Sequence, residues 1–260
     1  MPASPADIHN GQLHVVHGQL SGDAPLDTAV SRAILLQVSD GELPETLQVG
    51  TPHRVVAFGK HDTLSNGFDK AVGIAVDHGY DPTVRIAGGR AVVFSPTILR
   101  FAWTVPEAKP ADTMRTRFTT LSTAVVDTLA DIGVRGTMGE VPNEYCAGEY
   151  SVHIRGHRKV MGVGQRLTRS GAQVGGMIVV SDPDDINSVL VPMYQALDVP
   201  IDPTATGSIA DDLPTTPEDV AHAFTARIAA DRPTVDANIS DATMTLARTL
   251  RDDHVPSVLA

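Results

Sequence analysis

The sequence predicts an α+β fold: a mixed, mostly antiparallel sheet with helices packed on it. Three observations support this class. Apolar residues make up 42% of the chain, which is enough for a core. Short apolar runs, some of them spaced like hairpins, are interrupted by amphipathic segments. Strands and helices do not follow each other in the regular series that a parallel sheet requires. We expect one domain over residues 1–260, with a helical C-terminal extension from about residue 215 to 260.

The expected strands are short apolar runs bounded by turn residues. They cover residues 33–39, 54–59, 84–87, 91–94, 98–105, 151–154, 159–163 and 174–180. The runs 84–87 and 91–94 are separated by Gly88, Gly89 and Arg90, a spacing that predicts a hairpin.

Four helices are expected from apolar residues spaced three and four apart. They cover residues 67–79, 112–134, 185–194 and 216–232. Gly79 stands where the first helix should end. Thr216 followed by Pro217 is a typical start for the last one.

Composition excludes several function classes. The formal net charge of −11 disfavours binding to nucleic acid or to an anionic membrane. No apolar run reaches the roughly 18 residues needed to span a bilayer. The first residues show no basic segment followed by an apolar one, so no secretory signal is expected. One cysteine cannot form an internal disulfide, which favours a cytoplasmic protein.

Two windows of the chain contain no Asp or Glu but keep their basic residues. Residues 82–106 hold Arg85, Arg90 and Arg100. Residues 150–181 hold five bases: Arg155, Arg158, Lys159, Arg166 and Arg169. Buried strands would explain the missing acids. The retained bases favour a second interpretation, in which both windows face one anionic ligand or an acidic partner.

Cys146, the only cysteine, is the first candidate for chemistry. A cysteine is usually a small buried hydrophobe. Here its neighbours are polar or small and show no strand periodicity, so we expect an accessible loop. An accessible thiolate attacks acyl groups well, provided that its pKa falls below about 8.5. The ammonium of Lys159, farther along the chain, could lower that pKa.

Glycines next to basic residues form the second candidate. Gly88 and Gly89 allow close approach of a ligand to the backbone, and the flanking Arg85 and Arg90 favour an anion or an acyl carbonyl over a plain turn. In the strand after Lys159, Gly162 and Gly164 alternate, which places both on one face and leaves room for a ligand or for a crossing strand.

Other common sites are not indicated. The histidines lack zinc-like spacing, so we expect no metal. There is no Walker A segment, and no dinucleotide-binding glycine pattern opens a helix.

Together, three segments in order resemble the biotin/lipoate protein ligase superfamily. They are PHRVVAFGKHDT, VRIAGGRAVVFSPTILRFAW and RKVMGVGQR, and the similarity extends over roughly residues 34–180. The stretch YCAGEY is similar to the Y-C-P-G-x-Y segment of the octanoyl-[glycine-cleavage protein H]:protein octanoyltransferases. The resemblance implies the biotin/lipoate protein ligase, class II synthetase-like fold.

The resemblance also implies roles. Cys146 would carry the acyl group as a thioester, with Lys159 as its activating partner. The acyl site would be lined by Arg85, Gly88, Gly89, Arg90, Ala91, Gly162, Gly164 and Gln165. Acyl groups would pass between acidic lipoyl-carrier domains, namely protein H of glycine cleavage and E2 subunits of 2-oxoacid dehydrogenases.

The sequence departs from the family pattern at four points. Ala87 replaces a serine, Ala147 replaces a proline, and the step from Gly156 to Lys159 is one residue longer. The family's Asp-x-Gly-x-Leu-Asn reads SPTILR here, with neither Asp nor Asn.

The expected function is therefore an octanoyl or lipoyl transferase that needs no cofactor. Two alternatives stay open. One is an ATP-dependent lipoate–protein ligase, in which Lys159 and the arginines hold an acyl-adenylate. The other is a non-catalytic module that binds acyl groups or their carriers.

Overall fold

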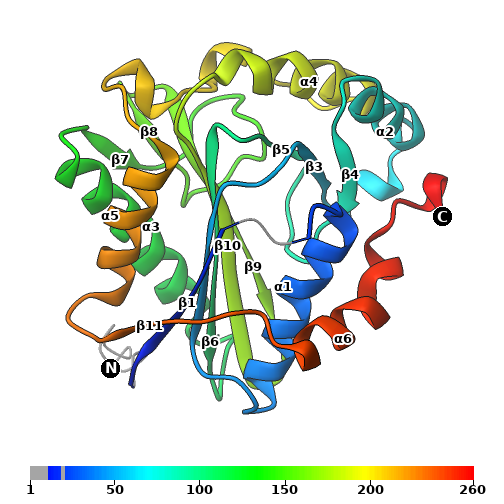
Figure 1. The fold of residues 1–260 in the computed structure, drawn as a ribbon. Coiled ribbons are helices and arrows are strands. Elements are labelled where there is room, and N and C mark those ends of the chain that lie inside the picture. Colours follow the sequence, from blue (N-terminus) through cyan, green and yellow to red (C-terminus); the bar gives the residue numbers. More distant parts are fainter. Residues whose placement is uncertain (1–10, 19–20) are drawn as a thin grey trace.

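The computed structural model describes residues 11–18 and 21–260, and the segment in which no secretory signal is expected lies mostly outside them. Two sheets and their covering helices form the body (Figure 1). The large sheet has the order β11-β1-β2-β6-β10-β9-β8-β7, and the small one the order β4-β3-β5. The large sheet is mostly antiparallel, with β1 parallel to both β2 and β11, so the predicted fold class is confirmed.

The strands of the large sheet are β1 (Leu13–His17), β2 (Thr46–Gly50), β6 (Ile98–Pro106), β7 (Gly136–Met138), β8 (Val152–Ile154), β9 (Arg158–Leu167), β10 (Gly171–Val179) and β11 (Thr234–Asp236). The small sheet contains β3 (Val55–Phe58), β4 (Asp81–Val84) and β5 (Val92–Phe94). The helices are α1 (Ala24–Ser39), α2 (Phe68–Asp77), α3 (Met114–Asp131), α4 (Pro183–Ala196), α5 (Pro217–Ala229) and α6 (Asp241–Leu250).

Helices cover both faces of the large sheet. Helix α1 lies on one face with α6 outside it, while α3 and α5 lie on the other (Figure 1). Helices α2 and α4 pack with the small sheet around a second apolar core. Trp103 and Phe101 are fully buried in the main core, where such side chains each contribute about 1.5–3 kcal/mol. The site described below lies where the two cores meet.

The predicted strand over residues 33–39 is wrong, because that run is the second half of α1. The Asp23 side chain caps the helix by accepting from the N–H of Leu26 at 2.9 Å, and Pro25 follows in the first turn. The helix is enclosed between the sheet and α6, so most of its circumference is apolar and the helical period is obscured.

The predicted hairpin through Gly88 and Gly89 is also wrong. Strands β4 and β5 do not pair with each other, because β3 lies between them and pairs with both. The glycine loop therefore crosses the end of β3. A Cβ on Gly59, just after that strand, would lie 1.8 Å from the carbonyl oxygen of Gly89, so the crossing requires glycine at position 59.

The C-terminal part joins the main body. Helix α5 packs against α3, β11 extends the large sheet beside β1, and α6 packs against α1. The division into one domain with an extension from about residue 215 stays a prediction. In the described part of the chain, no helix has the length and apolarity to cross a membrane.

Candidate active site

The thiol of Cys146 lies in the loop between β7 and β8, against the glycine loop that joins β4 to β5. Its Sγ accepts two hydrogen bonds at 3.3 Å, one from Nη2 of Arg85 and one from the backbone N–H of Arg90. Its own N–H donates to the Tyr194 hydroxyl at 2.8 Å. Cys146 adopts φ +43°, a left-handed conformation that costs free energy in a non-glycine residue and is held by these contacts.

A buried carboxylate organises this loop. Glu144 accepts from the N–H of Val141 at 3.0 Å, the N–H of Gly148 at 3.1 Å and the hydroxyl of Ser151 at 2.6 Å. It also accepts from Nζ of Lys159 at 3.0 Å, and both side chains of this ion pair are 0% exposed. The expectation of an open polar loop needs correction: Cys146 is half-buried, and the residues before it form an internal network.

Lys159 acts on the backbone beside the thiol. Besides Glu144, its Nζ donates to the carbonyl oxygens of Tyr145 at 2.8 Å and Cys146 at 3.0 Å. An ammonium has three N–H donors, so these bonds use all of them and leave none for the sulfur. Lys159 therefore orients the main chain of Cys146 and contributes charge from a short distance.

The electrostatic balance favours a thiolate. Burial raises the pKa of the Cys146 thiol, but the Arg85 charge, the Lys159 charge and the bonds from Arg85 and Arg90 lower it more, and the net pKa lies below the ordinary value. Burial lowers the pKa of Lys159, against the opposing influence of Glu144 and Cys146.

Gly89 makes the contact between the loops feasible. Its φ is +100°, and a Cβ there would lie 2.4 Å from Nη2 of Arg85 and 2.7 Å from Sγ of Cys146. The same Nη2 also donates to the carbonyl oxygen of Arg90 at 2.6 Å. A side chain at position 89 would thus displace either the guanidinium or the thiol.

Two further side chains fix the glycine loop from outside. Buried Asp62 accepts from Nη1 of Arg90 at 3.3 Å and from the N–H of Gly59 at 2.8 Å. Tyr194 on α4 donates to the carbonyl oxygen of Ala91 at 3.0 Å while accepting from Cys146. Its hydroxyl therefore ties the cysteine loop to the start of β5.

The glycines of β9 face the site. The Cβ position of Gly162 lies 3.2 Å from Cε of Lys159, and that of Gly164 lies 3.2 Å from Cβ of Ala87 and 3.4 Å from the oxygen of Gly88. Alternation along the strand explains this shared face, as predicted. The glycines make room for the lysine and for the glycine loop to pack against the sheet.

Gln165 is not part of this cluster. Its Oε1 accepts from Nε of Arg117 at 2.7 Å and its Nε2 donates to the oxygen of Met114 at 3.2 Å, so the side chain holds the start of α3. The other predicted site residues lie on the glycine loop, the cysteine loop and β9, which pack against one another.

Sequence reasoning missed Glu144, Tyr194 and Asp62. Glu144 lies two residues before Cys146, but nothing in the sequence distinguishes it from Glu149, which is exposed. Tyr194 and Asp62 come from segments that only the tertiary fold brings to the loop.

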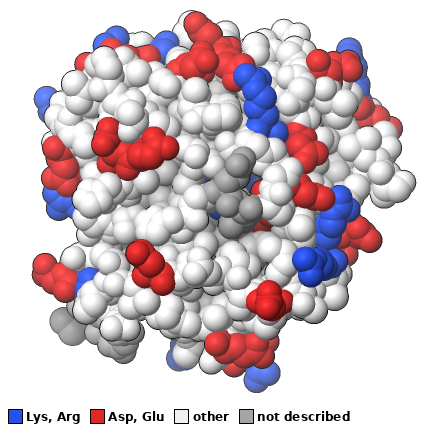
Figure 2. Space-filling view, viewed as in Figure 1, with Lys and Arg blue, Asp and Glu red and all other residues white. Residues whose placement is uncertain are grey.

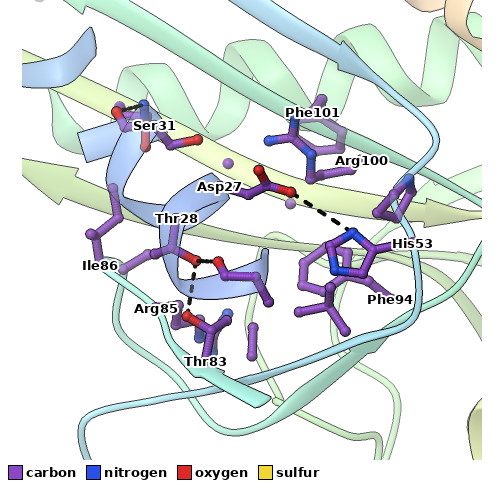
Figure 3. A pocket seen from close by; sticks show the side chains of 18 of the residues that line it. Asp27, Thr28, Ser31, His53, Thr83, Arg85, Ile86, Phe94, Arg100 and Phe101 are labelled. Atoms are coloured by element: carbon purple, nitrogen blue, oxygen red, sulfur yellow. Dashed lines mark hydrogen bonds and ion pairs between the residues drawn. The ribbon is translucent and has the colours of Figure 1, made fainter. Parts of the chain in front are cut away.

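A cavity of about 140 Å³ adjoins the site, between α1 and the two sheets (Figure 3). Arg85, whose guanidinium donates to the thiol, lines it together with Ala87. Its apolar lining includes Val55, Ala57, Ile86, Phe94 and Phe101. An extended acyl chain whose carbonyl is at Cys146 could enter this space.

The bases of the window 150–181 serve different purposes. Arg155 pairs with Asp212, and Arg158 pairs with Asp211 at 2.8 Å, so these two fasten the loop before α5. Lys159 is buried, while Arg166 and Arg169 are exposed. The face seen in Figure 2 carries acidic and basic side chains interspersed rather than one basic patch.

Comparison with known proteins agrees with this geometry. The chain is 27% identical over 175 residues to octanoyl-[GcvH]:protein N-octanoyltransferase of Geobacillus kaustophilus, covering 67% of this chain and 62% of that protein. It is 25% identical over 169 residues to lipoyl-[GcvH]:protein N-lipoyltransferase of Listeria monocytogenes, covering 65% and 60%. The match thus spans less than two thirds of the length of these relatives.

Solved structures share the fold. Lipoate-protein ligase A bound with ATP superposes with a TM-score of 0.76 at 20% identity, covering 94% of this chain and 95% of that one. The bipartite lipoate protein ligase from Thermoplasma acidophilum gives 0.72 at 17% identity, covering 94% and 93%. Residues 23–229 match the lipoyl protein ligase A/B catalytic domain, and this range includes Cys146 and the side chains described around it. The chain belongs to the family of lipoyl protein ligase A/B catalytic domains.

Proposed function

We propose that this protein transfers an octanoyl or lipoyl group from one carrier protein to a lysine of another, through a thioester on Cys146. One observation carries the proposal: in a lipoyl protein ligase A/B domain, the only cysteine of the chain has its sulfur held by two N–H donors beside a cavity. Two of the relatives reported above are named as octanoyl and lipoyl transferases.

The first half-reaction forms the acyl-enzyme. The Cys146 thiolate attacks the carbonyl carbon of the donor's acyl-lysine amide, a C–S bond forms, the C–N bond breaks, and the leaving amine takes up a proton. The side chain of Arg85 and the N–H of Arg90 already lie at the sulfur. We propose that these donors stabilise the negative charge that develops on the oxygen of the attached carbon.

The second half-reaction moves the acyl group to the acceptor. The ε-amine of a lysine on the acceptor attacks the thioester carbon, the new C–N bond forms, the C–S bond breaks, and the thiolate is restored. The proton released by this amine balances the one taken up in the first half. The reaction consumes no nucleotide, so no cofactor is needed.

Lys159 has a positioning role in this scheme rather than that of a base. Its three donors are occupied by Glu144 and two carbonyl oxygens, so it holds the left-handed turn at Cys146 and adds positive charge. The proposed acyl site consists of Arg85, Gly88, Gly89, Arg90, Ala91, Gly162 and Gly164, with Gln165 bracing α3 behind it.

The proposed partners are acidic lipoyl-carrier domains, protein H and E2 subunits, in the cytoplasm. Arg166 and Arg169, exposed on and after β9, are the bases of the window 150–181 that we propose attract them.

An ATP-free transfer assay tests the proposal. Octanoylated protein H is mixed with an apo E2 lipoyl domain and the purified enzyme, without ATP or free acid, and the mass of the acceptor is followed. Wild type should octanoylate the acceptor and Cys146→Ser should not, with circular dichroism showing that the variant is folded. Modification that requires ATP and free acid would show a ligase instead. Acceptor binding without transfer would show a non-catalytic module.

A further inference from the structure

The far end of the cavity is polar, although an octanoyl chain ends in a methyl group. Arg100 from β6, Asp27 from α1 and His53 from the loop before β3 lie together there, and Arg85 lies at the other end of the view (Figure 3). Arg100 stands in the SPTILR segment, the part of the sequence that departs most from the family pattern. The cavity is therefore apolar along its walls and charged at its end.

The guanidinium group of Arg100 makes no hydrogen bond or ion pair within residues 11–18 and 21–260. Burial lowers the pKa of Arg100, and the charge of the Asp27 carboxylate opposes that shift. The Arg100 side chain is half-buried and lines the cavity, so its N–H donors are available to a bound group.

His53 and Gln173 have further polar atoms that make no hydrogen bond to a described residue. Both ring nitrogens of His53 are buried without a hydrogen bond to any described residue, and Asp27 and Asp81 lie 3.8 and 3.7 Å from them, too far to bond well. Gln173 donates to the oxygen of Ser31 at 3.0 Å and to Thr104 at 2.9 Å. In the described part of the chain nothing donates to its Oε1.

The charged side chains that line this end of the cavity are the Asp27 carboxylate and the Arg100 guanidinium. Asp27 already accepts from the backbone and the hydroxyl of Ser21, at 2.7 and 2.6 Å. Its carboxylate and the Arg100 guanidinium together carry no net charge. A ligand carboxylate would meet Arg100 but also face Asp27. A neutral group that both accepts and donates would satisfy Arg100 with its oxygen and Asp27 or Gln173 with its proton.

We propose that this end of the cavity recognises a neutral polar group, a hydroxyl or a primary amide, at the far end of the acyl chain that Cys146 accepts. The inference rests on the proposed function in taking the cavity as the acyl pocket. A methyl-ended chain would cover Arg100 without giving it an acceptor. A dithiolane ring, whose sulfurs accept hydrogen bonds weakly, should rank between the two.

Matched thioesters test this. N-acetylcysteamine thioesters of eight-carbon acids that end in methyl, hydroxyl or carboxylate are incubated with the protein, and acylation of Cys146 is followed by intact mass. Wild type should react with the hydroxyl-ended chain at least about tenfold faster than with either other chain, the discrimination of one buried hydrogen bond. Arg100→Met should lose this preference and favour the methyl-ended chain. Arg248→Met, an exposed arginine on α6, should keep it.

The outcomes separate the two proposals. Equal rates in wild type, or a preference for methyl that Arg100→Met leaves unchanged, would overturn the inference while leaving the acyl-enzyme intact. If no thioester reacts, the thioester mechanism fails. The preference of the cavity for a polar chain end is then tested by ligand binding. In Cys146→Ser, 8-hydroxyoctanoic acid should raise the melting temperature more than octanoic acid does, and equal shifts would refute it. If Arg100→Met does not fold, the acylation rates of wild type with the three thioesters are enough to test the inference.

Discussion

Replacing Glu144 by Gln should disrupt the hydrogen bonds that fix the loop carrying the Cys146 thiol. The carboxylate accepts from four donors: the N–H groups of Val141 and Gly148, the hydroxyl of Ser151 and the ammonium of Lys159. A glutamine of the same shape brings an NH₂ group to one of the two oxygen positions, and donors already face both. One pair of donors must then point at each other, and Lys159 loses its counter-charge in a buried place.

The magnitude follows from the buried pair. Hydrogen bonds to charged groups contribute about 1.5–3 kcal/mol each, but they are not additive here because one carboxylate makes them all. Removing one partner of a buried ion pair costs about 3–5 kcal/mol. That is a large part of a typical domain's stability of about 5–15 kcal/mol. With an m-value of about 3 kcal/mol per molar urea, the unfolding midpoint should fall by roughly 1–2 M.

Urea denaturation of wild type, Glu144→Gln, Lys159→Met and the double variant measures this cost and the coupling between the two residues. The coupling energy should exceed about 1.5 kcal/mol, and Glu140→Gln, an exposed carboxylate on the same loop, should change the midpoint little. The rate of thiol acylation should fall at least about tenfold in Glu144→Gln. A loss of stability below about 1 kcal/mol, with normal acylation, would refute the role given to this carboxylate.

Three other substitutions probe the thiol itself. Gly89→Ala should slow acylation at least about tenfold, since its Cβ would overlap Arg85 and Cys146 and its φ of +100° adds about 1–3 kcal/mol of strain. Labelling of the Cys146 thiol by iodoacetamide at the wild-type rate would contradict this. Arg85→Met should move the pH profile of thiol alkylation to higher pH, because the Arg85 charge lowers the thiol pKa and its loss leaves less thiolate at neutral pH. An unchanged midpoint of this profile would count against the electrostatic explanation. Tyr194→Phe should lower the free energy of unfolding, measured with urea, by about 1–3 kcal/mol, because it leaves the N–H of Cys146 and the oxygen of Ala91 unpaired. A variant as stable as wild type would mean that water replaces the hydroxyl.

Local patterns predicted the helices that have one apolar face. Helices α2 and α3 match the sequence expectations closely, because each shows a clear helical period. The predicted strands over residues 98–105 and 159–163 lie within β6 and β9, and the one over residues 174–180 overlaps β10. Helix α1 was misassigned for the opposite reason. It is covered on both sides, and its apolar run resembles a strand. That error also hid the cavity, one wall of which is α1.

Motifs predicted which residues form the site, but not the hydrogen bonds between them. Arg85, Gly89 and Cys146 lie together as the resemblance implied. The sequence suggested that Lys159 would activate the thiol directly, whereas its donors bond to carbonyl oxygens and to Glu144. Such contacts depend on the left-handed turn at Cys146, which no local sequence rule predicts for a cysteine.

Intact-mass analysis of the protein mixed with octanoylated protein H, in the absence of ATP, tests the central claim most directly. The account predicts an octanoyl adduct on wild type that hydroxylamine removes, and none on Cys146→Ser. No adduct on wild type, together with acceptor modification only when ATP and free octanoate are supplied, would contradict it.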